Sequence, residues 1–425
     1  MLLLLLGGMG TPAQASERDR EIIIGVCVDL SGPAKIVGSA HLRGLEDYIG
    51  LVNEEGGVFG RKLKVVFADS KFNVYPDGLR GVEKIMEQFR PRFLVVDSTH
   101  LMVKLLGFQV DQKNKKLVRT GVPLVGPGKK YEVLLTSGSM MNDFAQEQIH
   151  PSVFVTGPTY GDQLRMLLRY AAREKKRAKV AFFYSGDTPY GYLPMSYAAH
   201  ECRKLGLRVM GEVTAPFGAG PDDEALGRAV KKIKQWGPDY VIINGFAGRP
   251  IPEFIKQCSE NGVKSVFLAT VLAMHEHILE MLKTVSSGYV YMGVSPFNYW
   301  TMKGPMIEKL KNFRRKKWPE THPNQEYLEE KDHQSIYYIL GAVEGMVLVE
   351  AAKRAYKQAG GMEPAFGQLI EGLRSIRDLP TGGLTHEPLT LKNNSFQVGR
   401  IFKADTKEAV FVPVPRTSWG DFFLR

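Results

Sequence analysis

The chain has 425 residues, of which 44 % are hydrophobic and 24 % are charged, which excludes a largely disordered protein. That length exceeds what one hydrophobic core usually serves, so two lobes of ~150–200 residues each are expected. The net charge is +11, but the lysines and arginines are dispersed and no nucleic-acid motif accompanies them, so no nucleic-acid partner is expected.

The first residues have the pattern of an export signal. Leu2 to Leu6 form an unbroken apolar run, and Ala13-Gln14-Ala15 has the form of a cleavage site. Residues 1–15 are therefore predicted to be a signal peptide, which places the mature protein in the periplasm. Neither this run nor any later segment reaches the ~20 apolar residues of a membrane span, so the mature chain is expected not to cross the membrane.

Strands and helices alternate along the chain. Short runs rich in β-branched residues predict strands, and apolar residues at helical spacing predict helices between them. The expected elements, in order, are strand 21–30, helix 38–53, strand 62–69, helix 75–90, strand 93–97, strand 179–184, helix 192–205, strand 207–213, helix 222–236, strand 240–244, helix 252–261, strand 266–270, strand 289–294 and a long helix within 334–358. This rhythm predicts an α/β fold of two doubly wound, parallel-sheet lobes.

No catalytic or cofactor motif is present in the sequence. It contains no G-x-S-x-G, P-loop or H-E-x-x-H pattern, so neither an enzyme nor a bound cofactor is expected. The two histidines of His275-Glu276-His277 would lie ~200° apart around a helix, which disfavours a shared metal. A helix start at the rim of a lobe is expected there instead. Three cysteines, Cys27, Cys202 and Cys258, fall in predicted elements and are expected to be buried free thiols.

The loops at the carboxyl ends of the strands are the predicted ligand site. In open α/β sheets, ligands bind in the crevice outside these ends. The loops are rich in Ser, Thr and Gly, whose hydroxyls and backbone N–H groups suit polar ligands, and they include aromatic residues that can supply apolar walls. Helix capping explains any single loop equally well, but six of them together favour binding. They span residues 30–33, 97–100, 136–139, 184–191, 244–248 and 270–272.

Several short motifs occur in an order that is typical of one family. The chain resembles the branched-chain amino-acid-type periplasmic binding proteins, also called type I extracellular ligand-binding receptors, over about residues 21–419. The motifs are at residues 31–33 (SGP), 53–61, 154–163, 187–191, 293–297 and 381–385.

The resemblance implies a solute-binding subunit of an ABC importer that closes on a small polar or aromatic organic ligand. It implies a monomer whose closed form an inner-membrane permease recognises. It also implies three crossovers between lobe 1 (residues 16–152 and 295–379) and lobe 2 (residues 153–294 and 380–425). A ligand-sensing regulatory receptor of the same fold is the alternative.

The family's ligand contacts can be carried over by matching motifs. They fall on Ser98, Thr99, Ser137, Gly138, Ser139, Tyr160, Tyr190, Phe246 and Val271. The loop at residues 126–128 competes with residues 137–139 for the same role.

Two departures from the family pattern bear on the ligand. Residues 270–272 (TVL) lack the acidic residue that pairs with an amino acid's ammonium group, which favours aromatic or other organic acids over branched-chain or other amino acids. Val37 stands where an aromatic side chain often covers the ligand, which predicts a more open pocket.

Overall fold

The structure of this chain is a computed structural model. It describes residues 21–423, except residues 112, 115, 140–149, 247, 286–288 and 322–333. The predicted signal peptide at residues 1–15 lies outside the described residues.

The central strands of the first sheet are buried on both faces, as their apolar runs predict. Its order within the described residues is β13-β14-β7-β6-β3-β1-β2, and the strands are parallel except for the antiparallel β13–β14 pair. The strands are β1 (Ile22–Val28), β2 (Leu63–Asp69), β3 (Phe93–Val96), β6 (Leu134–Ser137), β7 (Val153–Val155), β13 (Leu391–Lys392) and β14 (Ser395–Phe396).

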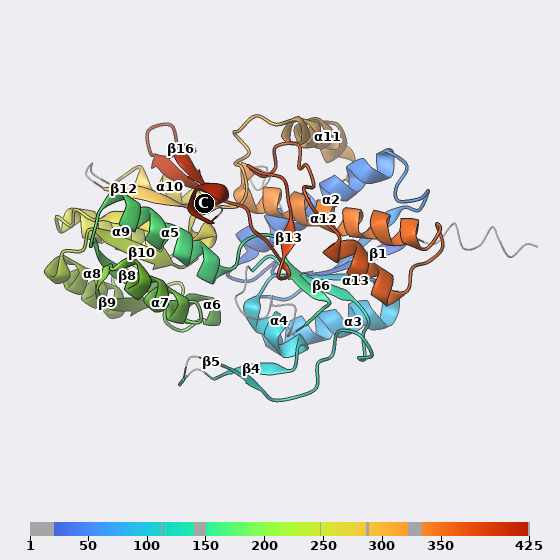
Figure 1. The fold of residues 1–425 in the computed structure, drawn as a ribbon, viewed down its shortest axis with the longest axis horizontal. Helices are drawn as coiled ribbons and strands as arrows, with labels where there is room; N and C mark the ends of the chain where they lie inside the picture. The colour runs from blue at the N-terminus through green and yellow to red at the C-terminus, as the bar shows by residue number, and fades with distance from the viewer. Residues whose placement is uncertain are drawn as a thin grey trace, which may run out of the picture.

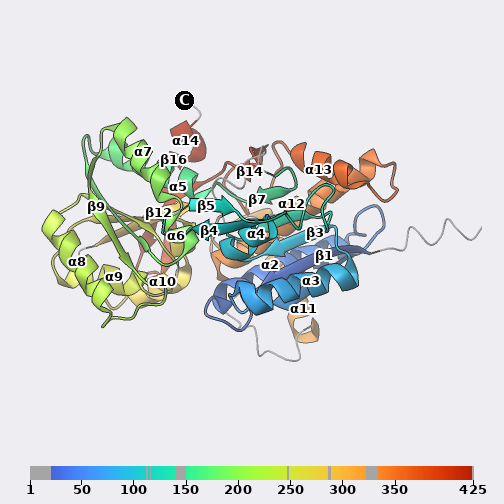
Figure 2. The ribbon, with the colours of Figure 1, turned by 90° about the horizontal axis from the view of Figure 1, so that it is seen from below.

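Helices cover both faces of this sheet (Figures 1 and 2). Ile24 and Val26 of β1 join the core beneath α2 and α12, whereas Cys27 joins the core beneath α3 and α4. The helices of this lobe are α2 (Lys35–Glu54), the π-helical turn η1 (Val74–Gly78), α3 (Leu79–Phe89), α4 (Thr99–Leu105), α11 (Pro305–Thr321), α12 (Ile336–Gln358) and α13 (Phe366–Arg374).

Two glycines bring α2 and α12 into backbone contact. A Cβ added at Gly44 would collide with the carbonyl oxygen of Tyr338, and one added at Gly341 would collide with that of His41. Any larger residue would push the helices apart, so this pair of glycines sets the spacing at which side chains of the two helices meet.

The second lobe repeats the architecture. Its sheet has the order β16-β15-β12-β11-β10-β8-β9, with β15 and β16 antiparallel at one edge. The strands are β8 (Lys179–Ser185), β9 (Arg208–Ala215), β10 (Tyr240–Asn244), β11 (Val266–Ala269), β12 (Val290–Ser295), β15 (Arg400–Asp405) and β16 (Val410–Ser418). Its helices are α5 (Tyr160–Glu174), α6 (Pro189–Tyr192), α7 (Met195–Leu205), α8 (Glu224–Trp236), α9 (Ile251–Glu260), the 3-10 turn η3 (Val271–Ala273), α10 (Glu276–Leu282) and α14 (Trp419–Phe423).

Within the part of the chain that the structure describes, the backbone passes between the two sheets three times, as expected. The crossings are at residues 156–159, 296–304 and 397–399. Two of the predicted lobe boundaries need correction. Val153–Val155 pairs with β6 and so completes the first sheet before the chain crosses. Residues 391–396 return to that same sheet, where Ser395 pairs with Val155, so they belong to lobe 1 and not to lobe 2.

Most predicted elements are present, and the predicted α/β fold of two doubly wound lobes is confirmed. A short hairpin, β4 (Phe108–Asp111) and β5 (Lys116–Arg119), was not predicted. Cys27, Cys202 and Cys258 are free and buried, as expected.

Candidate functional site

A cavity of about 170 Å³ lies between the lobes, at the carboxyl ends of strands from both sheets. Six of the nine predicted contact residues line it, and they come from both sides. Loops of the first lobe contribute Ser98, Thr99, Gly138 and Ser139, and loops of the second contribute Tyr190 and Phe246.

The hydroxyl groups of the first lobe form a chain that reaches the second lobe. The Ser139 hydroxyl lies 2.7 Å from the Thr99 hydroxyl and 3.2 Å from that of Tyr160, the first residue of α5. The Ser139 backbone N–H donates to the Ser137 hydroxyl at 3.0 Å. Tyr160 and Ser137 therefore hold the cavity wall in place from behind it.

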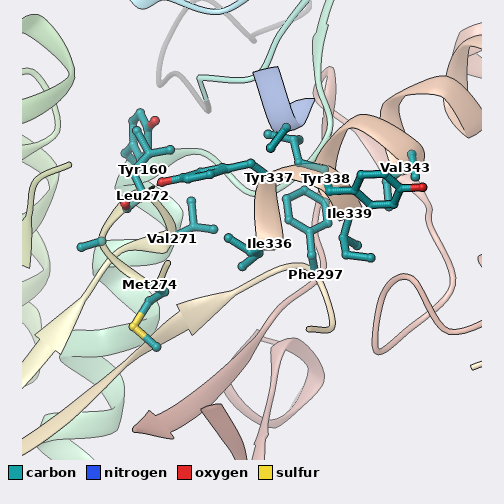
Figure 3. Close-up of a cluster of buried hydrophobic side chains, with 14 of the residues drawn as sticks. Tyr160, Val271, Leu272, Met274, Phe297, Ile336, Tyr337, Tyr338, Ile339 and Val343 are labelled. Atoms are coloured by element: carbon teal, nitrogen blue, oxygen red, sulfur yellow. Dashed lines mark hydrogen bonds between the residues drawn. The ribbon is translucent and has the colours of Figure 1, made fainter. Parts of the chain in front are cut away.

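The loop after β11 supplies Leu272 to the cavity in place of the predicted Val271. The N–H of Val271 donates to Gln163 at 2.9 Å, which keeps Val271 behind the wall. The carbonyl oxygen of Leu272 accepts a hydrogen bond of 2.8 Å from the hydroxyl of Tyr337, at the start of α12. Figure 3 shows the side chains of Val271, Leu272 and Tyr337 lying close together.

The competing loop at residues 126–128 does not supply any of the cavity-lining residues that the structure describes. Gly126 has a φ of +125° and donates to the carbonyl of Tyr131 at 2.9 Å, so this segment is a tight turn. The geometry favours residues 137–139 as the loop at the cavity.

A buried contact between a histidine and a glutamate, missed by the sequence analysis, supports that loop. Nε2 of His41 in α2 shares a hydrogen bond with Glu344 of α12, which is fully buried and also accepts from the hydroxyl of Thr136 at 2.9 Å. A Cβ added at Gly138 would lie 2.9 Å from the ring of His41. The ring thus packs directly under the loop, and only glycine fits there without displacing it.

Three phenylalanines from opposite lobes pack together at the cavity. Phe72 follows β2, and its ring stacks on that of Phe217 with centroids 5.5 Å apart. Phe217 in turn contacts Phe246 at 5.2 Å. Phe72 and Phe246 line the cavity and Phe217 does not. Val37 also lines it, but Phe72 supplies an aromatic cover from another loop, so the expectation of an open pocket is not met.

Asp97 directly follows β3 and contributes a carboxyl group to the cavity wall. Its Oδ2 atom accepts from the hydroxyl of Ser70 at 3.1 Å and from the N–H of Asp29. Burial raises the pKa of its carboxyl group to about 7.

The cluster at residues 275–277 begins helix α10, as expected. His275 is the N-cap residue and accepts from the N–H of His277 at 2.9 Å. Glu276 accepts from the N–H of Ile336, the first residue of α12, at 3.1 Å and thereby links the lobes. Burial lowers the pKa of His275 to about 3 and raises that of Glu276 to about 8. The described residues contain no group of three or more His, Cys, Asp or Glu placed to hold a metal ion.

The sequence was also compared with known families. A family model described as periplasmic binding protein matches residues 21–387. The chain belongs to this family. The resemblance inferred from the motifs is therefore confirmed.

Individual relatives of this periplasmic binding protein are distant. A Leu/Ile/Val-binding protein homologue from Brucella melitensis is 25 % identical over 263 residues, and the match spans 59 % of each chain. A branched-chain amino acid ABC transporter structure from Thermus thermophilus with bound valine has a TM-score of 0.75 at 20 % identity, covering 93 % of this chain and 96 % of the other. A fatty acid ABC transporter substrate-binding protein from Thermomonospora curvata has a TM-score of 0.66 at 18 % identity, covering 93 % and 91 %.

In this periplasmic binding protein, the residues that the sequence analysis missed are brought to the site by tertiary packing. Glu344 had a visible signal, because it is a lone acid in the apolar stretch 336–349. His41 and Phe72 had none. Among the described residues, no helix combines the length and apolar character needed to cross a bilayer.

Proposed function

We propose that this protein is the solute-binding subunit of an ABC importer. Exported to the periplasm, it captures a small organic ligand between its lobes as a monomer, and it presents the closed complex to an inner-membrane permease. It performs no chemistry on the ligand. The observation that carries this proposal is the cavity itself, which is walled by loops from both lobes, so a ligand there touches both and favours the closed form.

The contacts proposed within this cavity combine polar and apolar groups. Ser98, Thr99, Ser139 and Tyr190 offer hydroxyl groups, and Phe246 offers an apolar wall. Ser137, Gly138, Tyr160 and Val271 complete the proposed site by shaping its loops. A few polar groups that fix orientation within an apolar pocket are the usual composition of a small-molecule site.

The test is a ligand screen on the mature chain, residues 16–425. Amino acids, amines, amides, aromatic acids and short organic acids are titrated, and the melting temperature is recorded. A ligand present at a hundredfold excess over Kd stabilises the folded state by about 2.7 kcal/mol. Mass spectrometry of the recovered ligand should show it chemically unchanged. A screen with no stabilising compound, or one whose ligand is converted into product, contradicts the proposal.

A further inference from the structure

Among the described residues, the cavity wall contains a carboxyl group but no lysine or arginine. The titratable residues that line it are His41, Asp97, His100 and Tyr190. A ligand whose only charge is negative would therefore lose its hydration with no lysine or arginine to pair with, which is unfavourable.

Asp97 differs from the two other carboxylates beside it. Asp29 accepts from the N–H groups of Gly32 and Ala34, and Asp69 accepts from those of Leu30 and Lys71, so both are well supplied with donors. Asp97 uses Oδ2 for its two hydrogen bonds, whereas its buried Oδ1 has no partner among the described residues.

A buried acceptor without a donor raises the free energy of the empty protein. Oδ1 has almost no accessible surface, so a ligand donor would remove that cost once a rotation of the carboxyl group turns this atom toward the cavity, and the gain would be larger for a charged donor. The nearby His41 cannot serve this purpose through Nε2, because that atom already bonds to Glu344.

We propose that Asp97 determines ligand specificity by accepting a hydrogen bond from an N–H group of the ligand. The ligand is then an amine or amide with an apolar body, and not a simple organic anion. This inference rests on the proposed function and names the ligand class of that site. Val37, Phe72, Phe246 and Leu272 form the apolar walls that receive the carbon body. The acidic residue that the family pattern places after β11, and that this chain lacks, is thus replaced by Asp97 in the first lobe.

The test uses three probes that share one branched carbon skeleton: isoamylamine, isovaleramide and isovalerate. Affinities are measured by calorimetry at pH 8 for the wild type and for Asp97→Asn, with Asp222→Asn, an exposed aspartate, as the matched control. We expect the amine and the amide to bind at least tenfold more tightly than isovalerate. Asp97→Asn should weaken isoamylamine at least tenfold, whereas Asp222→Asn should leave all three affinities unchanged.

The wild type provides a second test if Asp97→Asn fails to fold. Isoamylamine keeps its charge between pH 6 and 8, while the carboxyl of Asp97 titrates near 7 because of burial. The groups around it are Asp29, Cys27, Asp69 and His41, and His100 lines the same cavity with a pKa that burial lowers. Binding of the amine should therefore release a proton, and its affinity should rise with pH across this interval.

Each outcome separates this inference from the proposed function. Tightest binding of isovalerate, or of any screened carboxylate without an N–H group, overturns the role of Asp97 but leaves a solute-binding protein. An amine affinity that is unchanged by Asp97→Asn and by pH also overturns it. If no compound in the ligand screen binds, both the proposed function and the role of Asp97 are contradicted.

Discussion

The stacked rings of Phe72 and Phe217 provide the sharpest test of how the cleft closes. Phe72 belongs to lobe 1 and Phe217 to lobe 2, and their centroids are 5.5 Å apart. Such a pair is worth ~0.5–1.5 kcal/mol, and 1.4 kcal/mol corresponds to a tenfold change in Kd. Because this contact joins the lobes, its loss should disfavour the closed form and weaken the ligand found by the screen.

Substitutions of the two phenylalanines should change Kd by different amounts, because only Phe72 lines the cavity. Phe217→Ala removes the contact between the lobes and the contact with Phe246, but no side chain that lines the cavity, so Kd should rise about 2- to 12-fold. Phe72→Ala also removes an apolar wall, so its effect should exceed that of Phe217→Ala. Once Phe72 is alanine, the further change at Phe217 should have a smaller effect than in the wild type, which a double-mutant cycle measures.

Calorimetric titration of the wild type and these three variants checks this reasoning, with Phe67→Ala, at a phenylalanine of β2 that is 54 % exposed, as the control. The control should bind as the wild type does. If Phe217→Ala leaves Kd unchanged, the stacked pair does not contribute to closure.

Two further predictions concern the supports of the site. Gly138→Ala should press on the His41 ring, which lies 2.9 Å from the new Cβ, and so should lower both the melting temperature and the ligand affinity. The control is Gly227→Ala, at a helical position with no atom within 4 Å of the new Cβ, which should stabilise the protein by up to ~1 kcal/mol. Equal melting temperatures for the two variants would argue against the contact between Gly138 and His41. Glu276 has a folded-state pKa raised to about 8 by burial, so the folded state binds more protons than the unfolded state between the ordinary carboxyl pKa and 8, and stability should fall as pH rises through that interval. Glu276→Gln keeps an acceptor for the N–H of Ile336, so its thermal unfolding curves should show a smaller fall between pH 5 and 8.5; an identical fall in both proteins would mean that Glu276 is not the titrating group.

The fold was largely predictable because its central strands carry their signal locally. Runs such as residues 22–28 and 240–243 are apolar throughout, as expected for short strands covered on both faces. The edge strands were not predictable in the same way. Ser395 pairs with Val155 across 240 residues of sequence, and strands of two or three residues leave no periodic pattern.

The site residues also differ in whether their sequence signal is local. Ser98, Thr99 and Ser139 were found because they follow strands, where topology gathers loops at one edge. His41 depends on Glu344, 303 residues away, and on the two glycines that let their helices touch. Asp97 stood within a predicted loop, yet its significance depends on which of three neighbouring carboxylates lacks donors, and only the folded structure settles that.

Calorimetric titration of wild-type protein and Tyr190→Ala with the ligand from the screen tests the central claim most directly. Tyr190 is buried in the wall that the second lobe contributes, so it contacts a ligand only if that ligand sits between the lobes. The account predicts one ligand per chain in the wild type and at least tenfold weaker binding in a Tyr190→Ala protein that remains folded. Equal affinity in the two proteins would place the ligand elsewhere and contradict the account.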